Sequence, residues 1–261
     1  MRRRFIADHV SANTAALTGD QAIHLARVLR AEPGQIYDVV ANGFLHRAEI
    51  TAVSEQEVLF TLHEELESDA ALPLHLLLAI FKFDHLEWAI EKATELGVTR
   101  ITPILARRTE KHLALAATKR VERWRRIALE AAKQSRRTDI PEITDPTTLK
   151  LALEHESSLT RILLSETEQT TTLTDALKDA SAATKDQVPH PSQPHREGWD
   201  VNSPPIRTTH ALAIGPEGGW TPEEMTLFAQ HQWQPVTLGP RILRAETAAI
   251  AAIAIASTHL A

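Results

Sequence analysis

Two stretches near the C-terminal end decide the fold that this sequence predicts: Ile214-Gly215-Pro216-Glu217-Gly218-Gly219-Trp220 and Leu238-Gly239-Pro240-Arg241-Ile242-Leu243-Arg244-Ala245-Glu246-Thr247. Each stretch follows a short apolar run and leads into a segment typical of a helix, the place where open α/β sheets bind ligands. Four of the chain's nine glycines, at positions 215, 218, 219 and 239, lie in them. Glycine serves where backbone takes positive φ or a ligand approaches closely. We therefore predict one ligand site built from both loops.

The first loop also admits a purely structural interpretation. Gly-Pro and Gly-Gly are turn formers, and Thr221-Pro222-Glu223-Glu224 has the cap, the N1 proline and the N3 glutamate of a helix start. An ordinary turn needs one glycine, however, and this loop has three around Glu217. We favour a binding loop over a simple connection.

The two loops are poorly suited to phosphate. Neither Gly-x-Gly-x-x-Gly nor a Gly-Lys-Ser/Thr ending occurs in the chain, and Glu217 would repel a phosphate group. Backbone amides and carbonyls beside a carboxylate instead suit a neutral or cationic ligand with hydroxyls and an amine, such as a sulfonium nucleoside with an amino-acid tail. Leu238, Ile242 and Leu243 could enclose its adenine. The two arginines of the second loop are available for a substrate phosphate or an electron-rich base.

The composition is that of a soluble globular protein. The chain has 261 residues, of which 43% are hydrophobic and 24% charged. It lacks cysteine, which excludes disulfides and thiolate chemistry and favours a cytoplasmic location. We expect no signal peptide, because no apolar segment follows Met1–Phe5, and no membrane association, because no apolar run is long enough to span a bilayer. The 13 histidines are scattered without metal-ligand spacing, so we expect no metal.

Positive charge is concentrated in one segment although the net charge is −6. Residues 119–137 hold eight basic side chains against two acidic ones. A local basic face on an acidic protein favours a defined contact with a polyanion. The alternative is an ordinary solvated helix surface.

Residues 1–72 predict a small, mostly β unit. Thr18-Gly19-Asp20-Gln21 has capping-box spacing ahead of a helix that reaches about Arg30. Asn42-Gly43 predicts a hairpin between strands at 35–41 and 44–53, and 58–63 reads as a further strand. These elements favour a small barrel or sandwich. The acidic segment 64–69 predicts a link, and we place the domain boundary there.

Residues 73–261 predict strands alternating with helices, which favours a mainly parallel sheet covered on both faces. The expected strands are 74–81, 98–105, 161–164, 210–214 and 235–238. Asp84 and Thr118 are expected to cap helices, with Gly97 ending the first of them. The Thr- and Pro-rich stretch 167–209 predicts a flexible insertion, most clearly at 185–207. Thr247–Ser257 predicts a helix that is apolar all round, buried on one side in the core and on the other in a subunit interface.

Several motifs, in this order, resemble the bacterial 16S ribosomal RNA uridine-N3 methyltransferase family (RsmE-type) of the SPOUT superfamily. The resemblance covers the chain from about Arg2 to its end, outside the insertion. The motifs that carry it are His24–Arg30, Lys92–Val98, Ile101–Ile104, Glu130–Arg136, Ile214–Gly219 and Leu238–Ala248.

The resemblance implies a fold, a cofactor and partners. The N-terminal unit would be a PUA-like β-barrel that binds RNA, and residues 73–261 would form a SPOUT domain with a deep trefoil knot. S-adenosylmethionine would lie in the knotted loops near the interface of a homodimer. The substrate would be 16S ribosomal RNA, expected within the 30S subunit. The expected cofactor contacts are Leu164, Ser165, Ile214, Gly215, Pro216, Glu217, Gly218, Gly219, Leu238, Gly239, Ile242, Leu243, Arg244 and Thr247. The expected RNA contacts are Arg2, Arg3, Arg4, His24, Arg27, Arg30, Arg120, Arg123, Arg126 and Arg136.

Three features depart from the family's pattern. Arg107-Arg108-Thr109 stands where the family usually has Glu-Arg-Ser, and Lys133 stands where an acidic residue is common. Both changes add positive charge, so they concern RNA more than cofactor. The insertion is also longer than is usual.

Methyl transfer to N3 of a uridine requires loss of the imide proton, so the site needs a base or a group that stabilises the anion. Arg244 is the candidate for stabilising charge on O2 or O4, although a salt bridge to Glu246 or to a partner subunit would explain it equally well. Glu217 or Glu246 could accept the proton, or could instead hold a loop through backbone amides.

Two other classes of protein are alternatives to this enzyme. The first is a non-catalytic RNA-binding or ribosome-assembly protein with a vestigial cofactor site, against which both intact loops speak. Titration with S-adenosylmethionine separates it from the enzyme. The second is a nicotinamide-dependent oxidoreductase, which lacks its glycine fingerprint.

Overall fold

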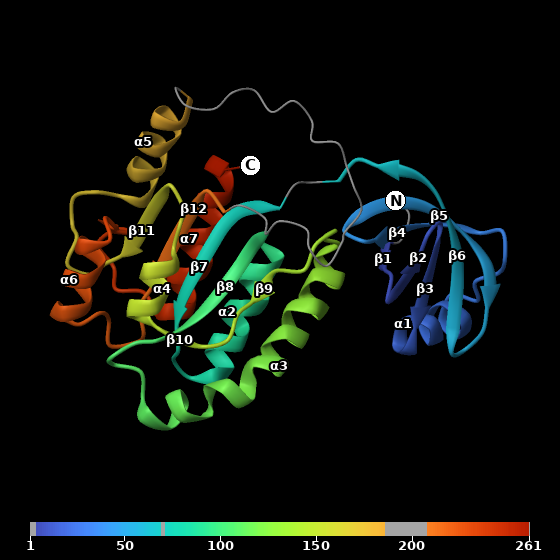
Figure 1. Cartoon of the computed structure of the whole chain (residues 1–261), viewed down its shortest axis with the longest axis horizontal. Coiled ribbons are helices and arrows are strands. Elements are labelled where there is room, and N and C mark those ends of the chain that lie inside the picture. Colours follow the sequence, from blue (N-terminus) through green and yellow to red (C-terminus); the bar gives the residue numbers. More distant parts are fainter. Residues whose placement is uncertain (1–3, 69–70, 186–207, 261) are drawn as a thin grey trace. The chain divides into compact units, whose positions relative to one another are not determined.

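The computed structural model describes residues 4–68, 71–185 and 208–260, with side chains for all of these except 181–185. The described residues form two compact units (Figure 1). One contains residues 4–68 together with 132–139, and the other contains 71–131, 140–185 and 208–260.

The N-terminal unit is a six-stranded sheet with the strand order β1-β4-β5-β6-β3-β2. β1 runs parallel to β4, and the other neighbours are antiparallel. Two register shifts between β5 and β6 curl the sheet around a core that includes Leu17, Leu25 and Phe60. The elements are β1 Arg4–Ile6, β2 His9–Ser11, β3 Thr14–Thr18, α1 Gly19–Ile23, the π-helical turn η1 His24–Val28, β4 Ile36–Ala41, β5 Phe44–Val53 and β6 Glu57–Leu66.

The predicted hairpin is confirmed, and two details of this unit were predicted wrongly. Asn42 and Gly43 both have positive φ, 51° and 82°, which a tight turn between twisted antiparallel strands requires. Thr18 is the N-cap of α1 but makes no capping hydrogen bond, because its amide and hydroxyl donate to the Asp8 carboxylate at 2.7 and 3.2 Å. β6 runs to Leu66, so the predicted acidic link begins as strand.

The second unit is built on a seven-stranded parallel sheet with the order β10-β8-β7-β12-β11-β13 and β9 beside β8. Every pairing in it is parallel. Its strands are β7 Leu72–Ala79, β8 Val98–Leu105, β9 Glu142–Ile143, β10 Thr147–Thr148, β11 Thr160–Leu164, β12 His210–Ile214 and β13 Gln234–Val236.

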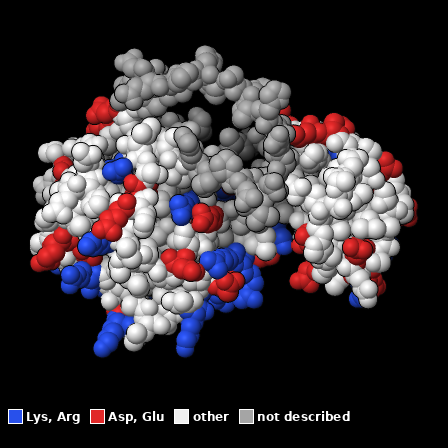
Figure 2. Space-filling model, viewed as in Figure 1, with Lys and Arg blue, Asp and Glu red and all other residues white. Residues whose placement is uncertain are grey.

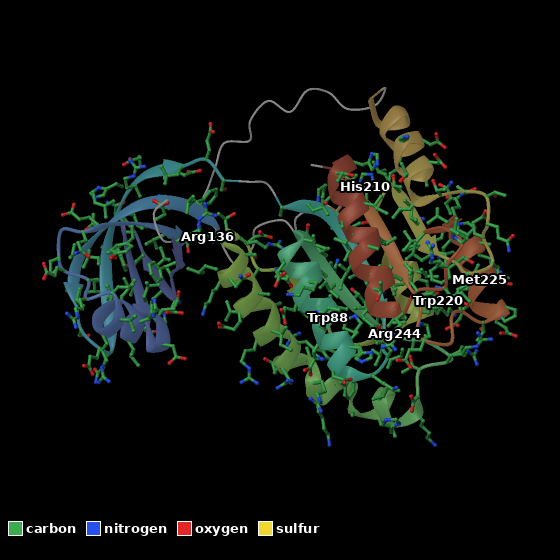
Figure 3. The ribbon with its side chains drawn as sticks, turned by 180° about the vertical axis from the view of Figure 1, so that it is seen from behind. Trp88, Arg136, His210, Trp220, Met225 and Arg244 are labelled. Carbon is green, nitrogen blue, oxygen red and sulfur yellow. The ribbon has the colours of Figure 1, made fainter. Side chains whose placement is uncertain are left out.

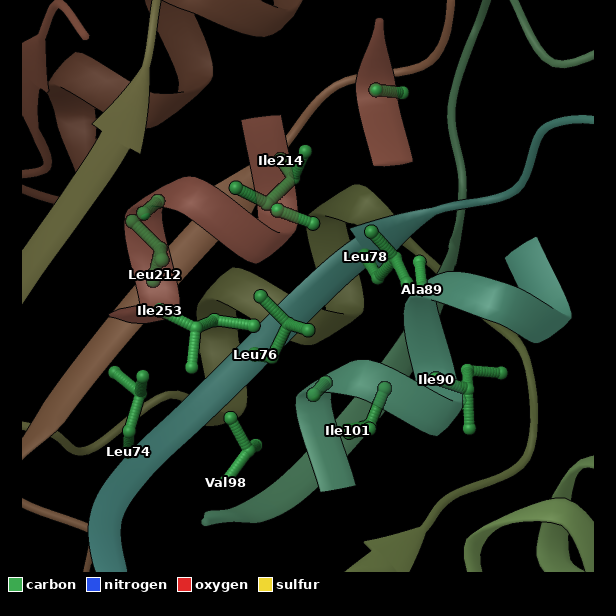
Figure 4. Packing of buried hydrophobic residues seen from close by; sticks show 14 of the residues in the cluster. Leu74, Leu76, Leu78, Ala89, Ile90, Val98, Ile101, Leu212, Ile214 and Ile253 are labelled. Carbon is green, nitrogen blue, oxygen red and sulfur yellow. The ribbon is translucent and has the colours of Figure 1, made fainter. Parts of the chain in front are cut away.

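Helices cover both faces of this sheet. Alternate residues of β7 explain why: Leu74, Leu76 and Leu78 face one core with α2, α3, α5 and α7, as Figure 4 shows for Ile90 and Ile253. The neighbouring residues of β7 face a second core, formed with α4 and α6. A strand buried on both faces reads as a continuous apolar run, as this one does. The helices are α2 Phe83–Glu95, α3 Lys111–Ser135, α4 Leu149–His155, α5 Leu173–Lys185, α6 Pro222–Gln230 and α7 Ala245–Leu260.

Several predicted boundaries in this unit were wrong. Lys82 is the N-cap of α2. Asp84 lies in the first turn, where its negative charge interacts favourably with the helix dipole instead of capping the helix. α3 begins at Lys111, well before Thr118, because Leu113 and Ala117 continue its buried face. Gly97 ends α2 with φ 96°, as predicted.

The predicted insertion is partly ordered. α5 lies within it and buries Leu173, Ala176 and Leu177 against the core. The rest of the prediction, residues 186–207, lies outside the described residues. Among the residues that are described, no helix is long and apolar enough to cross a membrane.

A buried polar network ties β7, β8 and the end of α4 together. The Nδ1 atom of His75 lies 2.5 Å from Oε2 of Glu156, and its Nε2 lies 2.8 Å from the hydroxyl of Thr102. The amide of Ser158 donates to Glu156 at 2.7 Å. Burial acts to raise the pKa of Glu156, but the hydrogen bonds from His75 and Ser158 outweigh it and lower the pKa to about 2.

We expect Glu156→Ala to lower the free energy of unfolding by about 3 kcal/mol. The substitution leaves the buried imidazole of His75 and the buried amide of Ser158 without their hydrogen-bond partner. The pKa of Glu156 is lower in the folded state than in the unfolded state. The ionised carboxylate therefore contributes its full stabilisation of the folded state above pH 4.5, and this contribution is lost as the pH falls towards about 2. Urea unfolding at pH 7 and pH 3 measures this. The matched control is Glu154→Ala, whose exposed carboxylate on the same helix lies 3.8 Å from Lys150. Equal losses for the two variants would contradict the interpretation.

Candidate active site

A pocket of about 1300 Å³ opens at the carboxyl edge of the parallel sheet. Its walls come from the segments that follow β7, β11, β12 and β13, together with Arg108 after β8. Parallel strands end at this edge together, so segments far apart in sequence meet there.

Thirteen of the fourteen residues predicted to contact a cofactor line this pocket. Thr247, in the first turn of α7, is the exception. Both glycine loops therefore line one pocket. The thirteen are Leu164, Ser165, Ile214, Gly215, Pro216, Glu217, Gly218, Gly219, Leu238, Gly239, Ile242, Leu243 and Arg244.

Two glycines of the first loop are required for different reasons. Gly219 has φ +68° and donates its amide to the Pro216 carbonyl at 2.8 Å, which closes a tight turn. Gly215 packs against the buried Trp220, since a Cβ there would lie 3.2 Å from the indole nitrogen. Trp220 is held in turn by Phe228 of α6, with ring centroids 4.9 Å apart.

The cap of α6 holds a second loop against the first. Glu224 is 5% exposed and accepts from the amides of Thr221 and Arg107, each at 2.8 Å. The predicted capping box is thus present, and it also fixes the loop after β8. Arg108 follows and donates to the Gly218 carbonyl, so it forms part of the pocket wall. The sequence named Arg108 only as the middle residue of Arg107-Arg108-Thr109, where Arg107 and Thr109 depart from the family's pattern, and did not place it in the pocket.

The second glycine loop presents side chains to the pocket. Gly239 has φ +113° and donates its amide to the Thr237 hydroxyl at 3.1 Å. Leu243 is half-buried, whereas Ile242 is 83% exposed. Arg244 is exposed, and its carbonyl accepts from Ala248 at 2.8 Å, so α7 begins directly behind it.

In a third loop, directly after β11, only Ser165 was predicted as a contact, because the loop's threonines resemble the start of an insertion. Glu168 shapes it by accepting from the Thr170 hydroxyl at 2.6 Å and from the amides of Thr170 and Thr171 at 2.8 and 2.9 Å. These bonds, led by that of the hydroxyl, lower the pKa of Glu168 to about 2. Its place directly after β11, at the carboxyl edge, is the signal that could have identified it. Residues of this loop that line the pocket are Ser165, Glu166, Thr167, Glu168, Gln169 and Thr172.

The three candidate catalytic residues lie in different surroundings. Glu217 and Arg244 are exposed and line the pocket. Glu246 is 3% exposed and does not line it. Its Oε1 lies 3.3 Å from Nδ1 of His85, a pocket residue of α2 that the sequence did not mark.

The candidate RNA residues of the first unit lie mostly at the surface. His24 and Arg27 lie on the exposed side of η1, and Arg30 follows with φ 49°. Arg27 forms an exposed ion pair with Glu55 at 2.5 Å. Arg4 is half-buried in β1, whereas Arg2 and Arg3 lie outside the described residues.

The candidate RNA residues on α3 and directly after its end divide into two groups. Arg120 and Arg123 both reach Glu87 of α2, at 3.4 and 2.8 Å, and Arg120 also stacks 4.9 Å above the Phe83 ring. Arg126 is exposed on α3, and Arg136, directly after the end of α3, is also exposed. Figure 2 shows Lys and Arg side chains gathered over α3 at the lower edge of this unit. Part of the basic face therefore serves packing between helices.

Residues 68–257 match the model of the RNA methyltransferase domain family. The chain belongs to this family. It is similar to the ribosomal RNA small subunit methyltransferases E of Bacillus subtilis and of a Synechocystis strain. It is 30% identical to the first relative, over 94% of this chain and 90% of the relative. It is 33% identical to the second relative, over 92% of this chain and 72% of the relative.

The fold has solved counterparts that carry a cofactor. The ribosomal RNA small subunit methyltransferase E of Neisseria gonorrhoeae, bound to S-adenosylmethionine, is 27% identical with a TM-score of 0.74 over 99% of this chain and 98% of that one. A putative methyltransferase of Legionella pneumophila in complex with the same cofactor has a TM-score of 0.72 and 27% identity. The predicted family and α/β fold class are confirmed, and the trefoil knot stays a prediction.

Proposed function

We propose that this protein methylates N3 of one uridine in the ribosomal RNA of the small subunit, with S-adenosylmethionine as methyl donor. The observation that carries the proposal is the convergence of both glycine loops on one open pocket at the carboxyl edge of the sheet. Its relatives named as small-subunit methyltransferases, and the cofactor-bound neighbours, support the reaction and the donor.

The residues of the pocket fit this cofactor. Glu166, Glu168 and Glu217 supply negative charge for an ammonium and a sulfonium group. The same three carboxylates would repel a phosphate group. Leu238, Ile242 and Leu243 offer apolar contact to an adenine. Gly219 and Gly239 keep their backbone free of side chains where the loops turn.

The cofactor supplies an electrophilic methyl group, and the protein must prepare the uridine. Holding N3 in line with the methyl group removes much of the barrier. Arg244 stabilises the negative charge that develops on O2 or O4 as the imide proton leaves. The open pocket and intact loops favour this enzyme over an RNA-binding assembly protein with a vestigial site.

Isothermal titration and a transfer assay test this proposal. We expect micromolar binding of S-adenosylmethionine, and transfer of labelled methyl groups to small-subunit particles from cells that lack the modification. Protein that binds the particles but shows no heat of cofactor binding would instead establish the assembly role.

We also propose that two copies of the chain associate through α7 and α2. α7 buries Ala249, Ala252, Ile253 and Ala256 in its own core but leaves Ile250, Ala251, Ala254 and Ile255 only half-buried. Trp88 of α2, which packs against α7, is 47% exposed. Apolar side chains left at the surface of neighbouring helices are typical of an interface.

We expect Trp88→Glu to convert the dimer to a monomer in sedimentation velocity runs at micromolar concentration, because a carboxylate would be buried without a partner. Leu159→Glu is the control, since Leu159 is 77% exposed just before β11. Dimerisation that persists in Trp88→Glu, or that is lost equally in both variants, would contradict this interface.

The exposed arginines of α3 are proposed to hold RNA phosphates. We expect Arg126→Ala to raise the KM for RNA several-fold without changing kcat, and to lower the salt dependence of binding by about one released counterion. Lys150→Ala is the control, because α4 covers the opposite face of the sheet. An unchanged salt slope for Arg126→Ala would remove Arg126 from the RNA interface.

A further inference from the structure

The strongest feature that the proposed mechanism does not use is the contact between His85 and Glu246. Glu246 lies in the first turn of α7 and is 3% exposed, which is expensive for a carboxylate without a charged or hydrogen-bonding partner. Nδ1 of His85 lies 3.3 Å from its Oε1. That Nδ1 and Oε2 of Glu246 are both shielded from solvent and have no hydrogen-bond partner in the part of the chain that the structure describes. The contact with Oε1 of Glu246 is therefore the polar contact that the described residues give to Nδ1 of His85.

The two ring nitrogens of His85 face different surroundings. Nδ1 faces the buried carboxylate, whereas the ring itself lines the pocket. The nearest acid to Nε2 is Asp84, whose side chain is 82% exposed and whose Oδ2 is 4.0 Å away. His85 and Trp88 lie one turn apart on α2, and Figure 3 labels Trp88 on this helix and Arg244 just before α7. His85 thus brings an imidazole to the pocket that Arg244 also lines.

A carboxylate behind a histidine has a definite chemical effect. Its negative charge favours the proton on the near nitrogen, which leaves the lone pair on the far nitrogen, and it stabilises the imidazolium that forms when that nitrogen takes up a proton. The charged groups printed near this ring are Asp84 beside it on α2 and Glu246 in the first turn of α7. Lys82 and Arg244 line the same pocket and supply its positive charge.

We propose that His85 is the general base for methyl transfer and that Glu246 is its positioning residue, an inference that rests on the proposed function. The N3–H bond of the uridine breaks and its proton passes to Nε2 of His85. The electron pair of N3 forms the new bond to the methyl carbon, and the carbon–sulfur bond breaks with its electrons remaining on sulfur. S-Adenosylhomocysteine and the methylated uridine leave, and the imidazolium returns its proton to water.

The test is single-turnover methyl transfer to unmodified small-subunit particles across pH 5.5–9, with cofactor affinity measured separately by titration. We expect His85→Gln to lower the rate about 100-fold or more, the usual contribution of a general base, with an affinity for S-adenosylmethionine within about threefold of the wild type. In the wild type the rate should rise with pH as the imidazole of His85 loses its proton, and this rise should be absent in His85→Gln. His112→Gln, an exposed histidine of α3 outside the pocket, should behave as the wild type.

Glu246→Gln supplies a second, independent readout. Loss of the carboxylate makes the imidazolium less stable, so the acidic limb of the pH profile should move to lower pH. A merely structural Glu246 would change the rate at all pH values and leave that limb in place, which would overturn the proposal. So would a His85→Gln enzyme with the wild-type rate and profile, or one whose rate loss is matched by weaker cofactor binding. A wild-type protein that transfers no methyl group would instead defeat the proposed function itself.

Discussion

Replacing Arg244 with methionine is expected to lower the rate of methyl transfer about 100-fold, which is the usual cost of removing one group that stabilises developing charge. The side chain keeps its length but loses the positive charge that would meet O2 or O4 of the uridine. Arg244 is exposed in the pocket wall, so the substitution buries no new group and should leave folding unchanged. The measurement is single-turnover transfer, with cofactor affinity determined in parallel.

Arg244→Lys is the informative companion, because it restores the charge but not the planar fork of donors. We expect it to recover part of the lost rate. A methionine variant that transfers methyl groups normally but no longer dimerises would assign Arg244 to a salt bridge with the partner subunit.

Replacing Gly219 with alanine is expected to weaken binding of S-adenosylmethionine roughly tenfold, which corresponds to about 1.4 kcal/mol. Gly219 has φ +68° and closes the turn through its bond to Pro216. A side chain in this left-handed conformation costs about 1–2 kcal/mol, so the loop would relax out of its binding geometry.

Gly19→Ala is the matched control. Gly19 has φ +54° and free space around its Cβ position, but it lies in the N-terminal unit. It should lose comparable stability in thermal melts while the cofactor affinity stays within about twofold of the wild type. Equal weakening by both variants would show that general destabilisation, and not the shape of the first glycine loop, governs binding.

The strand-to-helix loops could be predicted from the sequence because glycine reports backbone conformation directly. Positive φ at Gly219 and Gly239 and the close approach of Trp220 to Gly215 are local properties, and local sequence encodes them. The parallel sheet was predictable for a similar reason, since strands buried on both faces read as continuous apolar runs. That the loops meet in one pocket follows from the shared carboxyl edge.

The parts of the site that the sequence did not predict depend on contacts between segments that are distant in the chain. Arg108 reaches the pocket because Glu224, 117 residues further along the chain than Arg107, fixes the loop that carries it. His85 gains its significance from Glu246 on another helix, whereas the sequence alone left Glu246 as either a proton acceptor or a residue that holds a loop. The loop around Glu168 looked like an insertion because its order comes from hydrogen bonds to β13 and its neighbours, not from apolar burial.

Mass-spectrometric mapping of small-subunit ribosomal RNA tests the central claim most directly. RNA would be taken from a strain that lacks this protein, and from the same strain carrying either the wild type or Arg244→Met. We predict that N3-methyluridine disappears from one position in the deletion strain, returns with the wild-type protein and stays absent or scarce with the variant. An unchanged level of N3-methyluridine at every position in the deletion strain would contradict the proposed function.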